Sequence, residues 1–333
     1  MRLFASSAIA AFIAASTAFV TPVTAAPTEY PTTFPDPAPS KYSVVDHFFL
    51  QDDPSTDPDG FDVVTTGNFG LKPTFNWADV TDKITLLNSE HNSTGKKYKL
   101  FFLARHGEGF HNVVPRNYLS QDWTCYWQIR DGNGKYTWFD AQLTQNGVAQ
   151  ANRISQAWTE NLKNGAPLPQ SYYVSPLSRT LQTYNYTWSS ISTGKQPVIK
   201  ELSRETYGIG TESKRHPKSY IAANWPHYEF EDGFSEPDLL WTTYKHESKQ
   251  HRNYRARVFL DDIFYNDDSD VISLTSHSGF IHSILKVVNH RKFDLGTGQM
   301  IPLIIGAIRS EENPKLNKPW TYYNELCPSS QTV

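Results

Sequence analysis

Apolar runs that stop abruptly at a polar or basic residue alternate, through most of this chain, with stretches in which apolar residues recur every three or four positions. Short uninterrupted runs are typical of buried β-strands, and the longer spacing is typical of amphipathic helices. We predict strands over residues 99–104, 172–174, 198–200, 271–276 and 300–307. We predict helices over residues 143–161, 177–190, 245–265 and 280–288.

This alternation indicates the fold class. Strands separated by helices pair in parallel through right-handed crossovers, so the expected fold is α/β, with a doubly wound, mainly parallel sheet flanked by helices. We place this domain over residues 96–310. Residues 26–95 contain frequent Pro, Gly, Asp and Asn with scattered aromatics, which predicts a leader and an irregular N-terminal extension packed onto the domain. Residues 311–333 are assigned to a C-terminal tail.

The start of the chain predicts export. A basic residue, an apolar stretch and small residues before Pro27 are typical of a secretory signal peptide, which we assign to residues 1–25. The mature protein is then expected to be secreted and free of the membrane. The chain of 333 residues carries a formal net charge of -3. That charge gives no general attraction to nucleic acid or anionic lipid, so any anion must be bound locally.

Two further features bear on an exported protein. Asn92 and Asn185 each begin a glycosylation sequon, although Asn185 falls inside a predicted helix. Cys125 and Cys327 are the only cysteines, and two cysteines in an oxidising compartment suggest one disulfide. Two free thiols remain the alternative, because sequence spacing does not give distance in space.

Basic residues directly follow three of the predicted strands. Arg105 and His106 end the first apolar run, Arg179 begins the helix after the second, and His277 follows the third. Ligands of open parallel α/β sheets bind beyond the carboxyl ends of the strands. Two arginines and two histidines at that edge would suit a phosphate dianion.

These residue types fit phosphoryl transfer. A neutral histidine is a nucleophile on which a phosphoryl group can be held before water removes it. Arginines form forked hydrogen bonds to the phosphoryl oxygens, and the helix that begins after His277 adds backbone N–H groups. Charge of this kind stabilises the transferred group without a metal ion or another cofactor.

Several motifs together resemble the histidine phosphatase superfamily, and within it the fungal phosphoglycerate-mutase-like group. The resemblance rests on residues 103–112, 140–147, 175–183, 204–208, 231–236 and 276–279, and it covers about residues 42–307. It implies a phosphoglycerate-mutase-like fold and a small phosphorylated substrate. The phytase branch of the superfamily is disfavoured, because Glu108-Gly109 and His277-Ser278 stand where that branch has Arg-Pro and His-Asp.

The resemblance also implies roles. His106 would be the phosphorylated nucleophile, Arg105, Arg179 and His277 would hold the phosphoryl oxygens, and Asn112 would line the pocket. Glu205 would protonate the leaving group. Other carboxyl groups remain open as the proton donor, namely Glu108, Glu231, Asp232 and Glu236.

The function expected from these roles is metal-independent hydrolysis of phosphate monoesters through a phosphohistidine. A phosphoglycerate mutase is the first alternative, although the signal peptide argues against a cytosolic glycolytic substrate. A non-catalytic phosphate-binding protein is the second. No oligomeric state follows from the sequence.

Residues outside these motifs have simpler interpretations. His246 and His251 are five positions apart, so they do not share a helix face as a zinc protease requires, and we predict a solvated helix surface. His111 either shapes the pocket or packs in the core. Core packing is favoured over a substrate wall for Trp123, Trp127 and Trp138.

Overall fold

The computed structural model describes residues 40–91, 95–309, 320–322 and 327. Within them, seven strands form one sheet in the order β1-β8-β2-β7-β3-β4-β5, and β6 and β9 form a separate pair. The strands are β1 (Ser40–Val45), β2 (Lys96–Arg105), β3 (Ser171–Val174), β4 (Val198–Ile199), β5 (Glu229–Phe230), β6 (Lys245–Glu247), β7 (Val271–Ser276), β8 (Met300–Arg309) and β9 (Trp320–Tyr322).

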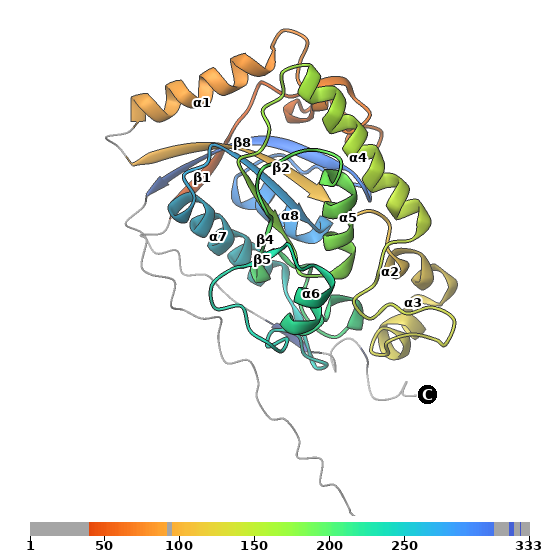
Figure 1. Cartoon of the computed structure of the whole chain (residues 1–333). Helices are drawn as coiled ribbons and strands as arrows, with labels where there is room; N and C mark the ends of the chain where they lie inside the picture. The colour runs from red at the N-terminus through yellow and green to blue at the C-terminus, as the bar shows by residue number, and fades with distance from the viewer. Residues whose placement is uncertain (1–39, 92–94, 310–319, 323–326, 328–333) are drawn as a thin grey trace, which may run out of the picture. The chain divides into compact units, whose positions relative to one another are not determined.

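Helices of ten or more residues cover the large sheet (Figure 1). They are α1 (Trp77–His91), α4 (Gln145–Lys163), α5 (Ser178–Trp188), α7 (Lys249–Asn266) and α8 (Ser278–Val287). Shorter helices lie in the connections, namely α2 (Phe110–Val113), α3 (Ser120–Asp122) and α6 (Lys218–Asn224). Single turns are η1 (Leu50–Asp52), η2 (Gly67–Gly70), η4 (Val114–Asn117), η5 (Trp123–Trp127), η6 (Glu201–Ser203) and η7 (Thr211–Ser213).

The predicted fold class is confirmed, with one strand that runs against the others. β2, β7, β3, β4 and β5 pair in parallel, whereas β8 pairs antiparallel with both β2 and β1. The reason is the connection after α8. Residues 288–299 return the chain to the carboxyl end of β2, where Gly298 N–H donates to the His106 carbonyl at 2.9 Å. The chain therefore enters β8 from that edge.

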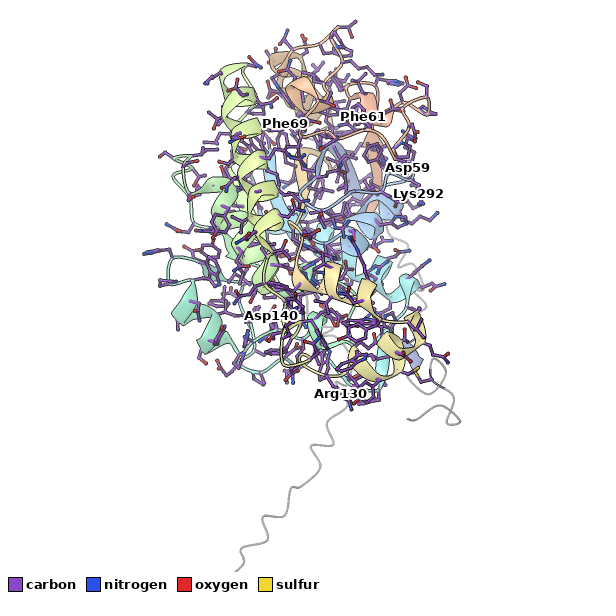
Figure 2. The ribbon with its side chains drawn as sticks, turned by 90° about the vertical axis from the view of Figure 1, so that its right-hand side faces the viewer. Asp59, Phe61, Phe69, Arg130, Asp140 and Lys292 are labelled. Carbon is purple, nitrogen blue, oxygen red and sulfur yellow. A yellow bond between two sulfur atoms is a disulfide. The ribbon has the colours of Figure 1, made fainter. Side chains whose placement is uncertain are left out.

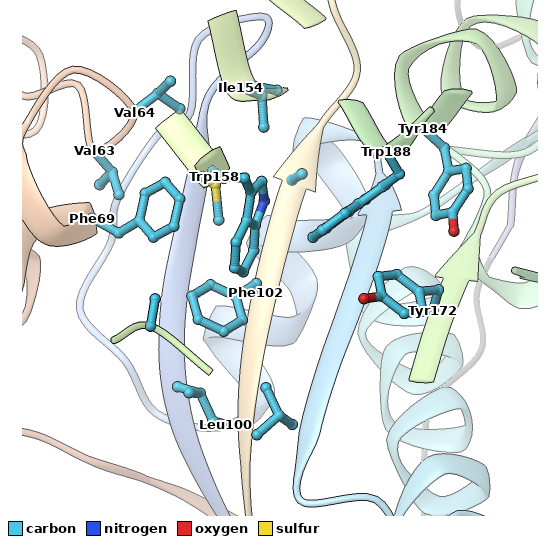
Figure 3. Packing of buried hydrophobic residues seen from close by; sticks show 14 of the residues in the cluster. Val63, Val64, Phe69, Leu100, Phe102, Ile154, Trp158, Tyr172, Tyr184 and Trp188 are labelled. Carbon is cyan, nitrogen blue, oxygen red and sulfur yellow. The ribbon is translucent and has the colours of Figure 1, made fainter. Parts of the chain in front are cut away.

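The two faces of the sheet bury different helices. Leu100, Phe102 and Ala104 alternate along β2 and belong to a core that includes side chains of α1, α4 and α5. Figure 3 shows Phe102 beside Trp158 of α4, with ring centroids 4.6 Å apart. On the opposite face, Phe101 packs against Phe264 of α7. This period of two along β2 is what a strand buried on both faces requires.

The N-terminal extension contains more regular structure than the sequence predicted. β1 pairs with β8, and α1 packs on β2 through Trp77, Val80 and Ile84. These three positions have helical spacing, but the turn-forming residues around them hide it. The expected aromatic packing is present, because Phe49 and Phe69 both contact Trp77.

The C-terminal segment is attached at two points. β9 pairs with β6, and Cys327 forms a disulfide with Cys125, with the two Cα atoms 5.7 Å apart. The predicted signal peptide, the leader up to residue 39 and Asn92 lie outside the described residues. Asn185 lies on α5, where Thr187 of the same sequon is buried. No helix of the described residues is long and apolar enough to cross a membrane.

Candidate active site

A cavity of about 270 Å³ lies at the carboxyl edge of the parallel strands. It is lined by Arg105, His106, His111, Asn112, Gln128, Arg179, Glu205, Thr206, Gly208, Gly210, Glu212, Ser213, His246 and Ser278. The strand-end motifs and the irregular segment after β4 therefore meet in one place, as the parallel topology predicts.

His106 is held in one position and one tautomer. Its backbone N–H donates to the Ser276 carbonyl of β7 at 3.0 Å, and its ring Nδ1 lies 2.7 Å from the Gly107 carbonyl. A carbonyl only accepts, so Nδ1 carries the proton and Nε2 has the free lone pair. Burial, followed by the charges of Arg179 and Arg105, lowers the pKa of His106 well below its usual value. The ring is therefore a neutral nucleophile at physiological pH.

The glycine after His106 is required by packing. A Cβ at Gly107 would collide with the backbone carbonyl of Gly147 at the start of α4. The Gly107 N–H instead donates to Thr183 Oγ1 of α5 at 2.9 Å. The Arg-His-Gly motif is thus fitted between α4 and α5.

Arg179 is a buried cation and Arg105 a half-buried one, and neither has a counter-charge in direct contact. Arg105 donates to the Leu295 carbonyl at 2.6 Å, and Arg179 donates to the Glu212 carbonyl at 2.8 Å. The Nε atoms of both arginines have no partner, and no ion pair among the described residues involves either of them. Burial lowers the pKa of Arg179 to about 10. Because two desolvated guanidinium groups share one cavity, an anion bound there would offset the cost of burying their charge.

Asp140 fixes the helix that carries Arg179. Its carboxylate accepts from the backbone N–H and the hydroxyl of Ser178, each at 2.8 Å. It therefore serves α5 as an N-terminal cap supplied from a distant segment. In Figure 2, Asp140 lies toward the opposite end of the domain from Phe61 and Phe69.

His277 lies beside His106 because their strands are neighbours in register. Arg105 pairs with Ser276 across β2 and β7, and the two rings have centroids 5.1 Å apart. His277 Nε2 is 2.8 Å from Ser175 Oγ, whereas Nδ1 is buried without a partner. Burial also lowers the pKa of His277 well below its usual value. The structure thus brings His277 beside His106, although it is Ser278 that lines the cavity.

Glu205 lies in the same cavity at the start of α8. Its carboxylate accepts from the Gly279 N–H at 3.1 Å and from the Thr206 N–H at 3.0 Å. Its charge acts on both Arg105 and Arg179, whose pKa values burial lowers and Glu205 raises. The predicted proton donor therefore lies near both arginines.

A buried ion pair holds the backbone that carries Glu205. Arg255 of α7 donates to the carbonyls of Leu202, Arg204 and Glu205 at 2.6 to 3.0 Å. Glu247 accepts from the same guanidinium at 2.6 and 2.9 Å. This ion pair anchors a segment that has little regular structure of its own.

The other predicted residues are also placed. Asn112 lines the cavity, where its side-chain oxygen accepts from the Gly109 N–H, so its amide NH₂ remains for a substrate. His111 lines the cavity as well. Glu108 instead accepts from Thr144 Oγ1 at 2.8 Å. The alternatives Glu108, Glu231, Asp232 and Glu236 are all outside the cavity lining.

One prediction about local environment is wrong. His246 lies on β6 and lines the cavity, whereas His251 is buried on α7 with Nδ1 2.7 Å from Glu247 Oε1. The predicted solvated helix surface is wrong, because the ion pair between Glu247 and Arg255 draws this segment inward. Three tryptophans form an aromatic cluster with Tyr118, and none of the three lines the cavity. They are Trp123, Trp127 and Trp138.

Sequence reasoning missed Glu212. This residue of η7 lines the cavity, and its Oε2 is buried without a partner. Burial raises its pKa to about 7. The sequence around Glu212 gives no sign of its burial, because the irregular segment after β4 has no periodicity from which burial can be inferred.

A neutral histidine, two arginines and carboxyl groups line one cavity at the strand ends of an α/β fold, and together they form a site suited to a phosphoryl group. Residues 101–298 match the family described as "Histidine phosphatase superfamily (branch 1)". The chain belongs to this superfamily.

Relatives of known name cover most of the chain. "Phosphomutase-like protein 3" of Candida albicans is 43% identical over 87% of this chain and 87% of its own length. A "Probable phosphoglycerate mutase" of Arthroderma benhamiae is 40% identical over 82% of this chain and 87% of its own length. A phosphoserine phosphatase variant of Entamoeba histolytica is 21% identical, with a TM-score of 0.34 over 62% of this chain and 94% of that structure.

Proposed function

We propose that this protein hydrolyses phosphate monoesters through a phosphohistidine at His106, without a metal ion. One observation carries the proposal: His106 presents a free Nε2 in a cavity lined by two arginines, one buried and one half-buried, that lack an ion-pair partner. Each arginine placed at about 4 Å from a phosphoryl oxygen contributes roughly 4 kcal/mol at an effective dielectric of 20. Two such contacts offset much of the cost of removing the dianion from water.

In the first step, His106 Nε2 attacks the phosphorus in line with the leaving oxygen. The N–P bond forms as the P–O bond to the alcohol breaks. When the Ser175 hydroxyl donates to His277 Nε2, His277 Nδ1 carries a proton that is free to bond a phosphoryl oxygen. The nucleophile and the groups that stabilise its transition state are then contributed by three neighbouring strand ends.

Glu205 is our choice of proton donor for the departing oxygen. It interacts with both arginines, and so lies close to where the phosphoryl group would be bound, whereas Glu212 interacts with Arg179 alone of the two. A carboxyl group beside a bound dianion holds its proton more tightly, as a general acid must. In the second step Glu205 takes a proton from a water whose oxygen attacks the phosphorus, so that the O–P bond forms, the N–P bond to His106 breaks and phosphate leaves.

Secretion is part of the proposal. Its support is the signal-like pattern of residues 1–25, together with the disulfide between Cys125 and Cys327. Glycosylation at Asn92 is proposed on its sequon alone. At Asn185 the helical setting and the buried Thr187 make modification of the folded protein unfavourable.

The test is release of phosphate from p-nitrophenyl phosphate by the mature protein. His106→Asn should remove this activity, whereas His282→Asn, at a half-exposed position of α8, should retain it. Near wild-type activity in His106→Asn would refute the mechanism. Phosphate binding without hydrolysis of any ester would instead support a non-catalytic binding protein.

A mutase is the alternative that the names of the relatives favour. Incubation with 3-phosphoglycerate distinguishes the two activities. The phosphatase proposal expects inorganic phosphate or no reaction, and net isomerisation to 2-phosphoglycerate would overturn it.

A further inference from the structure

The part of the cavity outside the phosphoryl-binding groups has a distinctive chemistry. Arg105 and Arg179 are the only lysine or arginine side chains that line it among the described residues. The remaining polar side chains are neutral amides, hydroxyls and imidazoles, together with the carboxyl groups of Glu205 and Glu212. Arg252, which lies 3.8 Å from Glu205, also donates to Thr206 and Ser283, and it does not line the cavity.

A charge count limits what the substrate can carry. Two arginines balance one phosphate dianion, so no positive charge remains in the cavity lining for a second anion. A carboxylate on the leaving group would face Glu212 instead. Because a buried charge without a partner is strongly unfavourable, an ester whose leaving group carries a carboxylate should not bind tightly.

Glu212 also has an open hydrogen-bonding position. Its Oε2 is buried and has no partner, although the main-chain carbonyl of the same residue receives Arg179 Nη1 at 2.8 Å. An unpartnered buried carboxyl oxygen is costly unless a ligand satisfies it. A hydroxyl donor on the leaving group would do so.

We propose that the substrate is the phosphate ester of a small neutral polyol or sugar, and that one of its hydroxyl groups donates to Oε2 of Glu212. This inference rests on the proposed function and specifies its leaving group. A cationic amine is the less favourable occupant. An amine bound at Glu212 would be repelled by Arg179, because the charge of Arg179 also acts on that carboxyl group.

The experiment compares two esters that differ in one group. Glycerol 3-phosphate has CH₂OH where 3-phosphoglycerate has a carboxylate. At about pH 8, we expect kcat/KM to favour glycerol 3-phosphate by at least about tenfold, which corresponds to about 1.4 kcal/mol. Where turnover is too slow, the inhibition constants of both esters against p-nitrophenyl phosphate give the same comparison.

Variants assign the preference to Glu212. Glu212→Gln keeps the shape and removes the charge, so the ratio between the two esters should fall severalfold. Glu231→Gln is the matched control, because Glu231 is also a largely buried carboxyl with a pKa raised by burial to about 7, but it lies outside the cavity lining. Its ratio should match wild type.

Three results would overturn the inference. They are equal or better use of 3-phosphoglycerate, better use of O-phosphoethanolamine than of glycerol 3-phosphate, and an unchanged ratio in Glu212→Gln. Failure of the proposed function gives a different result, namely no hydrolysis of p-nitrophenyl phosphate. In that case, calorimetric binding of the two esters still decides the preference.

Discussion

Replacing Arg179 by methionine tests whether this buried charge destabilises the folded protein when no anion is bound and stabilises a bound phosphate. Burial lowers the pKa of Arg179 from 12.5 to about 10. Because each tenfold change in proton affinity corresponds to about 1.4 kcal/mol, a pKa lowered this far means that the charged side chain costs the folded state about 3 kcal/mol. The cost applies at every pH below about 10 and disappears as pH rises toward 12.5, so it is fully present at neutral pH.

Arg179→Met removes that cost with a side chain of similar length. It also removes one hydrogen bond, to the Glu212 carbonyl, worth about 1 kcal/mol. We therefore expect the free energy of unfolding to rise by up to about 2 kcal/mol in the absence of phosphate. Affinity for inorganic phosphate should fall by about a thousandfold, which corresponds to the roughly 4 kcal/mol of one close charge pair.

Urea denaturation with and without phosphate measures both effects. Wild type should be stabilised by phosphate, since a ligand that binds only the folded state raises its stability. Arg179→Met should be more stable without phosphate and should not respond to it. Arg153→Met is the control. It breaks the ion pair of Arg153 with Asp62, whose side chains are both partly exposed, and should change stability by less than about 1 kcal/mol. A destabilised Arg179→Met that still responds to phosphate would refute the reasoning.

Three other outcomes follow from the same structure. Glu205→Gln should slow hydrolysis of an alkyl phosphate by about 10² to 10⁴-fold, but that of p-nitrophenyl phosphate far less, because nitrophenolate leaves without a proton; equal losses would contradict its role as acid. Glu212→Gln should stabilise the protein above pH 7 by about 3 kcal/mol. The pKa of Glu212 is raised from 4.5 to about 7, so the wild-type protein loses stability as pH rises between these values, and the variant does not. A gain in urea denaturation that does not depend on pH would contradict this. Cys125→Ser, which opens a loop of 202 residues, should lower stability by at most about 5 kcal/mol, and reductant should then have no further effect on its denaturation midpoint.

The clustering of the strand-end residues was predictable because topology and register follow from simple patterns. Short apolar runs separated by helices favour parallel strands, and the carboxyl ends of parallel strands lie at one edge of the sheet. Arg105, His106 and Arg179 accordingly line one cavity, with His277 beside them.

What escaped prediction depends on long-range packing. The direction of β8 depends on the path of residues 288–299, which alternation of apolar residues does not encode. The character of Glu212 depends on burial by segments far away in sequence, and the inward position of His251 depends on the ion pair of Arg255. Each of these is a property of the assembled fold rather than of a motif.

The central claim is that a covalent phosphoryl group forms on His106. Wild type mixed briefly with p-nitrophenyl phosphate, denatured in alkali and digested should yield a peptide containing His106 that carries one acid-labile phosphoryl group. The same peptide from His106→Asn should be unmodified, and the peptide containing His282 should be unmodified in both. Rapid hydrolysis by wild type with no phosphoryl group on His106 at any time during turnover would contradict the account.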